Sequence, residues 1–214
     1  DGYAALMEDH AGHYTLAPST HDLVIRFLSA LPLKKRPRIV TTDSEFHSLR
    51  RQLQRLQEEG IEVAWVPAHP VATLPERLVK VVNDRTAVVL MSAVFFNSGH
   101  RAPELAAVAA RCQEVGAEFL VDAYHALNVA PFTVEGLESA FIVGGGYKYC
   151  QMGEGNCFLR VPRDCQLRPV ITGWMADFGA LEKAGDATAP VGYGAGGARF
   201  AGSTFEPASH YRAD

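Results

Sequence analysis

Apolar runs and amphipathic stretches alternate along much of the chain. Short apolar runs, typical of buried strands, occupy residues 38–42, 61–66, 86–94, 119–121 and 140–143. Stripes of leucine or alanine at helical spacing occupy residues 49–60 and 103–115, and Gly60 and Gly116 are suited to end these helices. This alternation predicts right-handed βαβ units. The expected fold class is therefore α/β, with a mostly parallel sheet and helices on both faces.

A further helix is predicted near the start of the chain. Ser19 or Thr20 is suited to cap it, and an apolar stripe follows at Leu23, Val24, Phe27, Leu28 and Leu31. A helix N-terminus offers free N–H groups and the positive end of the helix dipole, which together suit a phosphate group. An ordinary helix cap fits these residues equally well.

Reactive side chains gather after the last two apolar runs of the βαβ region. Asp122 and His125 follow one run, and a glycine stretch leading into Tyr147 and Lys148 follows the next. The carboxyl ends of parallel strands meet at one edge of an open sheet, where ligands bind. The sequence therefore predicts that an acid, an imidazole, a phenol and an amine lie together.

This set of groups suits the chemistry of pyridoxal 5′-phosphate (PLP). A lysine amine can hold the PLP aldehyde as a Schiff base, and an aspartate can pair with the pyridinium nitrogen. We therefore assign catalytic roles to Lys148, Asp122 and His125; the imidazole is placed to bond Asp122 or the ring oxygen. In the alternative interpretation Asp122 is a helix cap, Lys148 lies in solvent and residues 144–146 form a simple loop.

Three segments carry a resemblance to a known family. VDAYHALNVAPF, VGGGYKY and GEGNCFLRV resemble the aspartate and lysine segments of kynureninase, a fold-type I PLP enzyme of the class V aminotransferase group. The resemblance implies that residues 1–214 form a PLP-dependent transferase-like large domain. It also implies that an N-terminal arm and a C-terminal small domain are missing from this chain.

The same resemblance implies further cofactor ligands. Ser19 and Thr20 match the first phosphate loop, and Phe46, or failing it His47, would stack on the pyridine ring. Independently of the resemblance, the Tyr147 phenol at the same sheet edge is expected to reach the phosphate. Asn97 or Ser98 would lie near the phenolic oxygen; a plain turn is the competing interpretation. Further phosphate ligands, contributed across the interface of a homodimer, are expected at Trp174, Ser203 and Thr204.

The resemblance also implies an activity on an amino-acid substrate. The first expectation is hydrolytic Cβ–Cγ cleavage of kynurenine to anthranilate and alanine. A class V aminotransferase, a β-lyase and a cysteine desulfurase are alternatives. The desulfurase is disfavoured, because its catalytic cysteine lies well beyond the lysine in that family, whereas Cys157 and Cys165 follow Lys148 too closely in the sequence. A non-catalytic subunit is the remaining alternative. No G-x-G-x-x-G motif follows a predicted strand, as a dinucleotide-binding enzyme would need, and the G-x-S-x-G motif of serine hydrolases is absent.

Composition and net charge indicate which kinds of binding partner are not expected. A net charge of −4 and a pI of about 6.1 give no indication of a nucleic-acid partner. No apolar run reaches the roughly 20 residues that span a bilayer, so no membrane partner is expected. The four cysteines show no paired spacing, and no set of metal ligands is complete. Free thiols and the lack of a signal sequence predict a cytoplasmic location.

Overall fold

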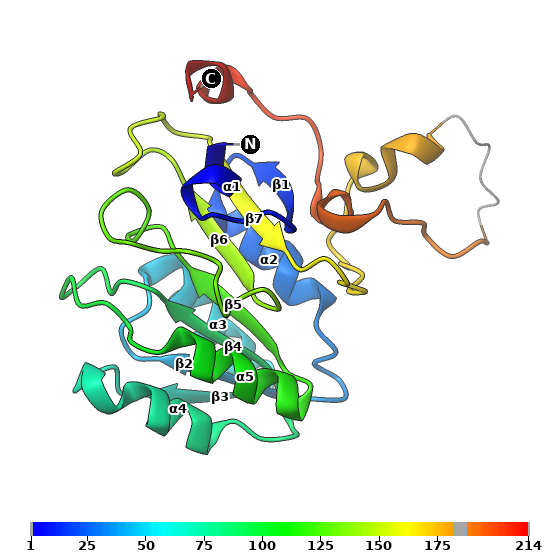
Figure 1. Cartoon of the computed structure of the whole chain (residues 1–214). Helices are drawn as coiled ribbons and strands as arrows, with labels where there is room; N and C mark the ends of the chain where they lie inside the picture. The colour runs from blue at the N-terminus through cyan, green and yellow to red at the C-terminus, as the bar shows by residue number, and fades with distance from the viewer. Residues whose placement is uncertain (1, 182–187, 214) are drawn as a thin grey trace.

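The computed structural model describes residues 2–181 and 188–213. Its centre is a seven-stranded sheet with the order β1-β7-β6-β5-β4-β2-β3 (Figure 1). The strands are β1 (His13–Ala17), β2 (Arg38–Thr42), β3 (Glu62–Val66), β4 (Thr86–Ser92), β5 (Glu118–Asp122), β6 (Phe141–Gly145) and β7 (Cys157–Val161). The α-helices are α1 (Gly2–Leu6), α2 (Thr20–Ala30), α3 (His47–Glu58), α4 (Leu74–Val81), α5 (Leu105–Val115) and α6 (Ala208–Ala213).

Strand directions confirm the predicted mostly parallel sheet. The pairs β2–β3, β2–β4, β4–β5 and β5–β6 are parallel, and β7 alone runs against its neighbours β1 and β6. The strand predicted at residues 38–42 coincides with β2, and the predicted helix starts and stops fall within a few residues of the observed ones. Among the described residues, no helix is long and apolar enough to cross a membrane.

Helices cover both faces of the sheet, as predicted. Alternate residues of β4 enter opposite cores: Val88 and Leu90 pack with α2 and α3, whereas Val89 and Met91 pack with α4 and α5. Figure 1 shows α4 and α5 on the near face, with η2 (Trp174–Ala180) standing out to one side near η3 (Gly196–Phe200). Burial on both faces explains why the central strands read as unbroken apolar runs.

The glycines before the lysine segment correct one boundary. The sequence pattern ends the strand at Val143, but β6 continues through Gly144 and Gly145, which pair with Phe158 and Cys157 of β7. A Cβ atom on Gly145 would lie 2.7 Å from both the Cys157 sulfur and the Tyr124 ring. The simple-loop interpretation is therefore wrong for these two glycines, because close packing outweighs their weak strand propensity.

Candidate active site

The candidate site lies at the carboxyl edge of β5 and β6. These neighbouring parallel strands end at Asp122 and Gly145, and the chain after β6 brings Lys148 back over the same edge. A cavity of about 230 Å³ opens there. It is lined by Pro18, Ser19, Thr20, Phe46, Asp122, Tyr124, His125, Tyr147, Lys148, Glu154, Gly155 and Cys157. The predicted meeting of acid, imidazole, phenol and amine is thus found in one cavity.

Three aromatic rings surround the Lys148 amine. Its Nζ lies 4.9 Å from the ring centre of Phe46, 4.8 Å from that of Tyr124 and 5.7 Å from that of Tyr147. Burial lowers the pKa of Lys148 from its usual value, and the charge of Asp122 acts in the opposite direction. A larger fraction of this amine is therefore neutral near pH 7 than for a lysine in water.

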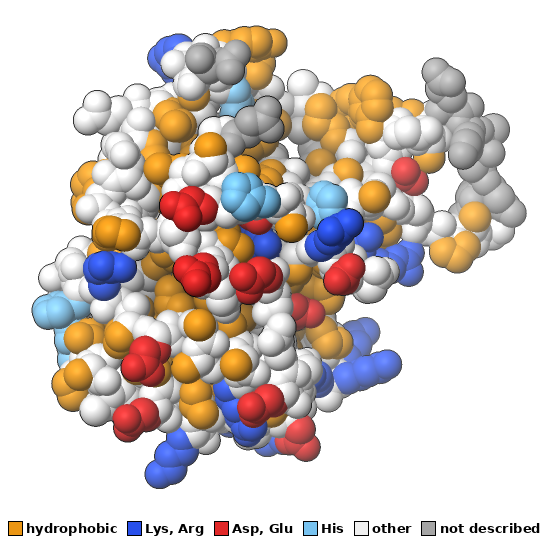
Figure 2. All heavy atoms as spheres, viewed as in Figure 1, with side chains coloured by type: hydrophobic (Ala, Val, Ile, Leu, Met, Phe, Trp, Pro, Cys, Tyr) orange, Lys and Arg blue, Asp and Glu red, His pale blue; other side chains and the backbone are white. Residues whose placement is uncertain are grey.

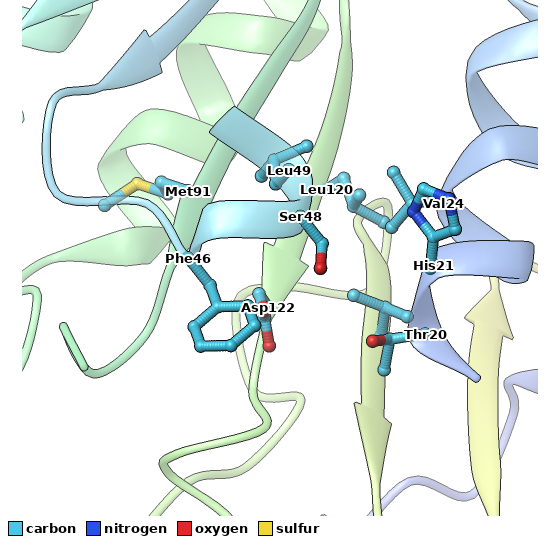
Figure 3. Close-up of a pocket in the computed structure, with 10 residues that line it drawn as sticks. Thr20, His21, Val24, Phe46, Ser48, Leu49, Met91, Leu120 and Asp122 are labelled. Carbon is cyan, nitrogen blue, oxygen red and sulfur yellow. The ribbon is translucent and has the colours of Figure 1, made fainter. Parts of the chain in front are cut away.

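Asp122 forms the floor of the cavity. Its Oδ1 accepts the Tyr124 backbone N–H at 2.8 Å. Burial raises the Asp122 pKa to about 6, although this N–H and the Lys148 charge both favour the ionised form. Figure 3 shows the carboxyl group beside the Phe46 ring, in an adjoining pocket that shares Thr20, Phe46 and Asp122 with the main cavity.

His125 pairs with the lysine. Its Nε2 lies 2.7 Å from Lys148 Nζ. Burial, and then the Lys148 charge, lower the His125 pKa to about 4, so the imidazole is neutral at pH 7. A neutral imidazole nitrogen accepts the hydrogen bond that the lysine donates. Among the described residues His125 bonds the Lys148 amine and not Asp122, and the other expected partner, the ring oxygen of the cofactor, stays a prediction.

The N-terminus of α2 forms another wall. Ser19 caps this helix: the Asp22 N–H donates to Ser19 Oγ at 3.1 Å, and that hydroxyl donates to Asp22 Oδ2 at 2.8 Å. Thr20 follows on the first helical turn, and Figure 3 shows it on the α2 side of the pocket, across from Phe46 and Asp122. Hydroxyl groups and a helix N-terminus therefore face a cavity that holds an amine and a carboxyl group.

Four predicted ligands do not line this cavity. Asn97 is exposed and donates from Nδ2 to Ser44 Oγ at 3.4 Å. Trp174 is 43% exposed and packs against Phe178 on η2. Ser203 and Thr204 are exposed on the strap between η3 and α6. Trp174, Ser203 and Thr204 were predicted to reach the site of a second subunit. Their absence from the cavity of their own chain therefore does not test that prediction.

Tyr124 and Cys157 line the cavity without having been assigned a role. The only available signal for Tyr124 was its place between Asp122 and His125 just after a strand. Burial raises the pKa of the Cys157 thiol, so this group is not poised as a thiolate. Between the two candidates for the stacking ring, Phe46 reaches the cavity, whereas His47 is exposed and packs against Phe96.

Comparisons with known proteins agree with this geometry. The chain is 26% identical over 159 residues to the mitochondrial cysteine desulfurase of Candida albicans, covering 73% of this chain and 32% of that protein. A C-DES mutant with glycine covalently linked to the PLP cofactor superposes with a TM-score of 0.76 at 22% identity, covering 99% of this chain and 56% of that one.

A second structure is the complex of the cystine C–S lyase C-DES with its product cysteine persulfide, with a TM-score of 0.73, 20% identity and coverage of 99% and 56%. The chain thus spans about one third of the first curated relative and 56% of these structures. The family model for class V aminotransferases matches residues 18–204. The chain therefore belongs to the class V aminotransferase family.

Proposed function

We propose that this chain is the cofactor-binding domain of a PLP-dependent enzyme that acts on an amino acid. The observation that carries the proposal is the Lys148 amine, which lies 2.7 Å from a neutral His125 in a cavity floored by Asp122. Membership of the class V aminotransferase family supports it. We assign residues 1–214 to the large domain of the fold.

The donor set of the cavity fits PLP. Lys148 supplies an amine for the cofactor aldehyde, Asp122 an anion for the ring nitrogen, and Phe46 a flat face for the ring. Ser19 and Thr20 at the N-terminus of α2, with Tyr147, offer the kind of groups that hold a phosphate. Each part of the cofactor therefore has a matching group in the same cavity.

Each residue has a distinct task in this scheme. When bound, PLP supplies an electron-accepting ring that stabilises negative charge on the substrate Cα. Asp122 keeps the ring nitrogen protonated, and Lys148 holds the cofactor and then moves the Cα proton as a general base. His125 accepts a hydrogen bond from the Lys148 amine and thereby orients it. Phe46 keeps water from one face of the ring.

We propose cleavage of the bond between Cβ and sulfur as the reaction, with cysteine or cystine as the substrate class. The support is the set of relatives, which are cysteine desulfurases and a cystine C–S lyase. Kynureninase-type cleavage of a Cβ–Cγ bond is the second candidate, because the segments around Asp122 and Lys148 resemble that enzyme. We also propose a homodimer in which the partner contributes Trp174, Ser203 and Thr204.

The test starts from the full-length protein loaded with PLP and reduced with borohydride. We expect mass spectrometry to find the pyridoxyl group on Lys148. Cystine should yield pyruvate, ammonia and cysteine persulfide, or cysteine should yield alanine while its sulfur passes to a thiol as a persulfide. Lys148→Ala should bind PLP without covalent attachment and lose at least about 1,000-fold in turnover, because base and tether disappear together. The exposed Lys80 gives a matched control, Lys80→Ala.

A pyridoxyl group that persists in Lys148→Ala would refute the lysine assignment. Cleavage of kynurenine with no reaction on either sulfur amino acid would replace the first substrate class by the second.

A further inference from the structure

Glu45 places a second carboxyl group behind Asp122. The side chain is only 1% exposed, and it follows β2 at the turn into α3. Within residues 2–181 and 188–213, Glu45 forms no ion pair. A buried carboxyl group without a cation has a strong preference for the neutral form.

Two hydroxyl groups hold this carboxyl group in place. Thr42 Oγ1 donates to Glu45 Oε1 at 2.5 Å, and Ser92 Oγ donates to Glu45 Oε2 at 2.7 Å. The Ser44 N–H donates to Thr42 Oγ1 at 3.3 Å, which leaves the Thr42 proton free to face Glu45. Both carboxyl oxygens are therefore fixed by neighbouring strand ends.

Ser92 also connects Glu45 to the floor of the cavity. It ends β4, and its register partner on β5 is Asp122. Burial raises the Glu45 pKa to about 7; the Ser92 and Thr42 hydroxyls act against this, and the charge of Asp122 raises the pKa further. The two acids are therefore coupled across adjacent strands.

In the part of the chain that the structure describes, few other charged groups lie near Glu45. In the β2–α3 turn, Asp43 is exposed, and its Oδ1 accepts the Ala68 N–H at 2.9 Å. From β4 the neighbouring group is the uncharged Ser92, and from β5 it is Asp122. Lys148 acts on Asp122 from inside the cavity. Glu45 therefore responds mainly to the charge at Asp122.

We propose that Glu45 is a positioning residue that links cofactor binding to release of a proton. While Asp122 is an unpaired anion, Glu45 keeps its proton; when a cationic ring nitrogen pairs with Asp122, Glu45 loses it. This inference rests on the proposed function, since it needs a ring cation at Asp122. By reciprocity, an ionised Glu45 favours retention of the ring-nitrogen proton.

The direct test follows Glu45 itself by carbon NMR of the glutamate carboxyl groups, with Glu45→Gln to assign the signal. Adding PLP should lower the pH at the midpoint of the Glu45 titration by about 1 unit, because the repelling charge is neutralised. The PLP analogue with carbon in place of the ring nitrogen keeps the phosphate and aldehyde. It should leave the midpoint where it is in the apoprotein.

A companion experiment needs no cofactor. In the apoprotein, Asp122→Asn removes the repelling charge and should lower the Glu45 midpoint. Ser92→Ala removes a hydrogen bond to the ionised form and should raise it. An unchanged midpoint in Asp122→Asn would overturn the inference, and Ser92→Ala identifies the Glu45 signal even if Glu45→Gln does not fold.

Cofactor affinity provides the functional readout. Between pH 6 and 8 the PLP affinity of the wild type should gain about 5-fold relative to Glu45→Gln, because a 1-unit shift of the Glu45 midpoint limits the whole gain to ~10-fold. Glu118→Gln, at the opposite end of β5, is the matched control and should follow the wild type. Equal pH profiles for the wild type and Glu45→Gln, with PLP still on Lys148, would overturn this inference alone. Absence of PLP from Lys148 would overturn the proposed function instead.

Discussion

At the scale of single residues, burial sets the protonation states around Lys148. Desolvation penalises whichever form is charged, so it raises the pKa of Asp122 and Glu45 and lowers that of His125 and Lys148. Acids and bases are thereby moved toward neutrality from opposite sides. A lysine amine with a lowered pKa, such as Lys148 in the cavity, takes up a proton from a substrate more readily near pH 7 than a lysine in water does.

The imidazole yields a stability prediction. The folded-state pKa of His125 is about 4, below the ordinary value of about 6.5, so the unfolded chain takes up its proton first as pH falls. The contribution of His125 to the free energy of unfolding is fully present above pH ~6.5 and is lost as the pH falls toward 4. When the pH falls from 7 to 5, the free energy of unfolding of the wild type should decrease by about 1 kcal/mol more than that of His125→Gln. This figure includes a reduction because the imidazole is partly exposed to solvent.

Urea unfolding at both pH values measures this difference, and the exposed His10 supplies a control, His10→Gln. Equal losses in the wild type and His125→Gln would show that the imidazole is as easily protonated in the fold as in the unfolded chain.

At the scale of elements, the end of β6 shapes the cavity. Gly145 pairs with Cys157, and the missing side chain lets the Tyr124 ring and the Cys157 sulfur approach the strand. Tyr124 then packs on Tyr147 at a ring-centre distance of 5.5 Å. Gly145 therefore determines the positions of Tyr124 and Cys157, two side chains that line the cavity.

Gly145→Ala should consequently destabilise the fold by about 1–3 kcal/mol, the usual cost of overpacking. It should also weaken PLP binding by displacing Tyr124. The control is Gly179→Ala, since nothing lies within 4 Å of a Cβ there. Unfolding midpoints and cofactor titration measure both effects; equal midpoints for the two variants would show that the strand relaxes without strain.

At the scale of the whole molecule, a buried ion pair fastens the N-terminal segment to the sheet. Arg160 Nε on β7 lies 3.0 Å from Asp9 Oδ2, and the two side chains are 2% and 3% exposed. Arg160 also donates to the carbonyl oxygens of Glu138 and Ala140. Burial acts to raise the Asp9 pKa, but hydrogen bonds from Arg160 and Tyr14 lower it to about 2.

Asp9→Asn should destabilise the protein by about 3 kcal/mol, because it leaves the Arg160 charge buried and unpaired. The wild-type contribution is present above the ordinary aspartate pKa of about 3.9 and is lost as pH falls toward 2. Urea unfolding at pH 7 measures it. Glu114→Gln, which breaks the exposed pair with Arg111, should cost less than about 1 kcal/mol; a similar cost for both variants would contradict the prediction.

The features that could be predicted from the sequence depend on patterns among residues close together in the chain. Periodicity predicted β2 to β6 and the helices α2, α3 and α5, since side-chain direction repeats along each element, but it did not predict the edge strand β1. The order of Asp122, His125 and Lys148 indicated a PLP site because each residue follows a strand end. Class V family membership is confirmed, whereas the relative named above is a cysteine desulfurase and not a kynureninase.

The sequence by itself determined the α/β fold and which reactive groups reach the carboxyl edge, because both follow from short-range spacing. Only the tertiary structure decided which groups touch. Strand order sets Glu45, Ser92 and Asp122 side by side although they are far apart in the chain. Packing likewise joined His125 to Lys148 and carried β6 through Gly145. Contact between distant residues depends on how strands pair, and no local pattern encodes that.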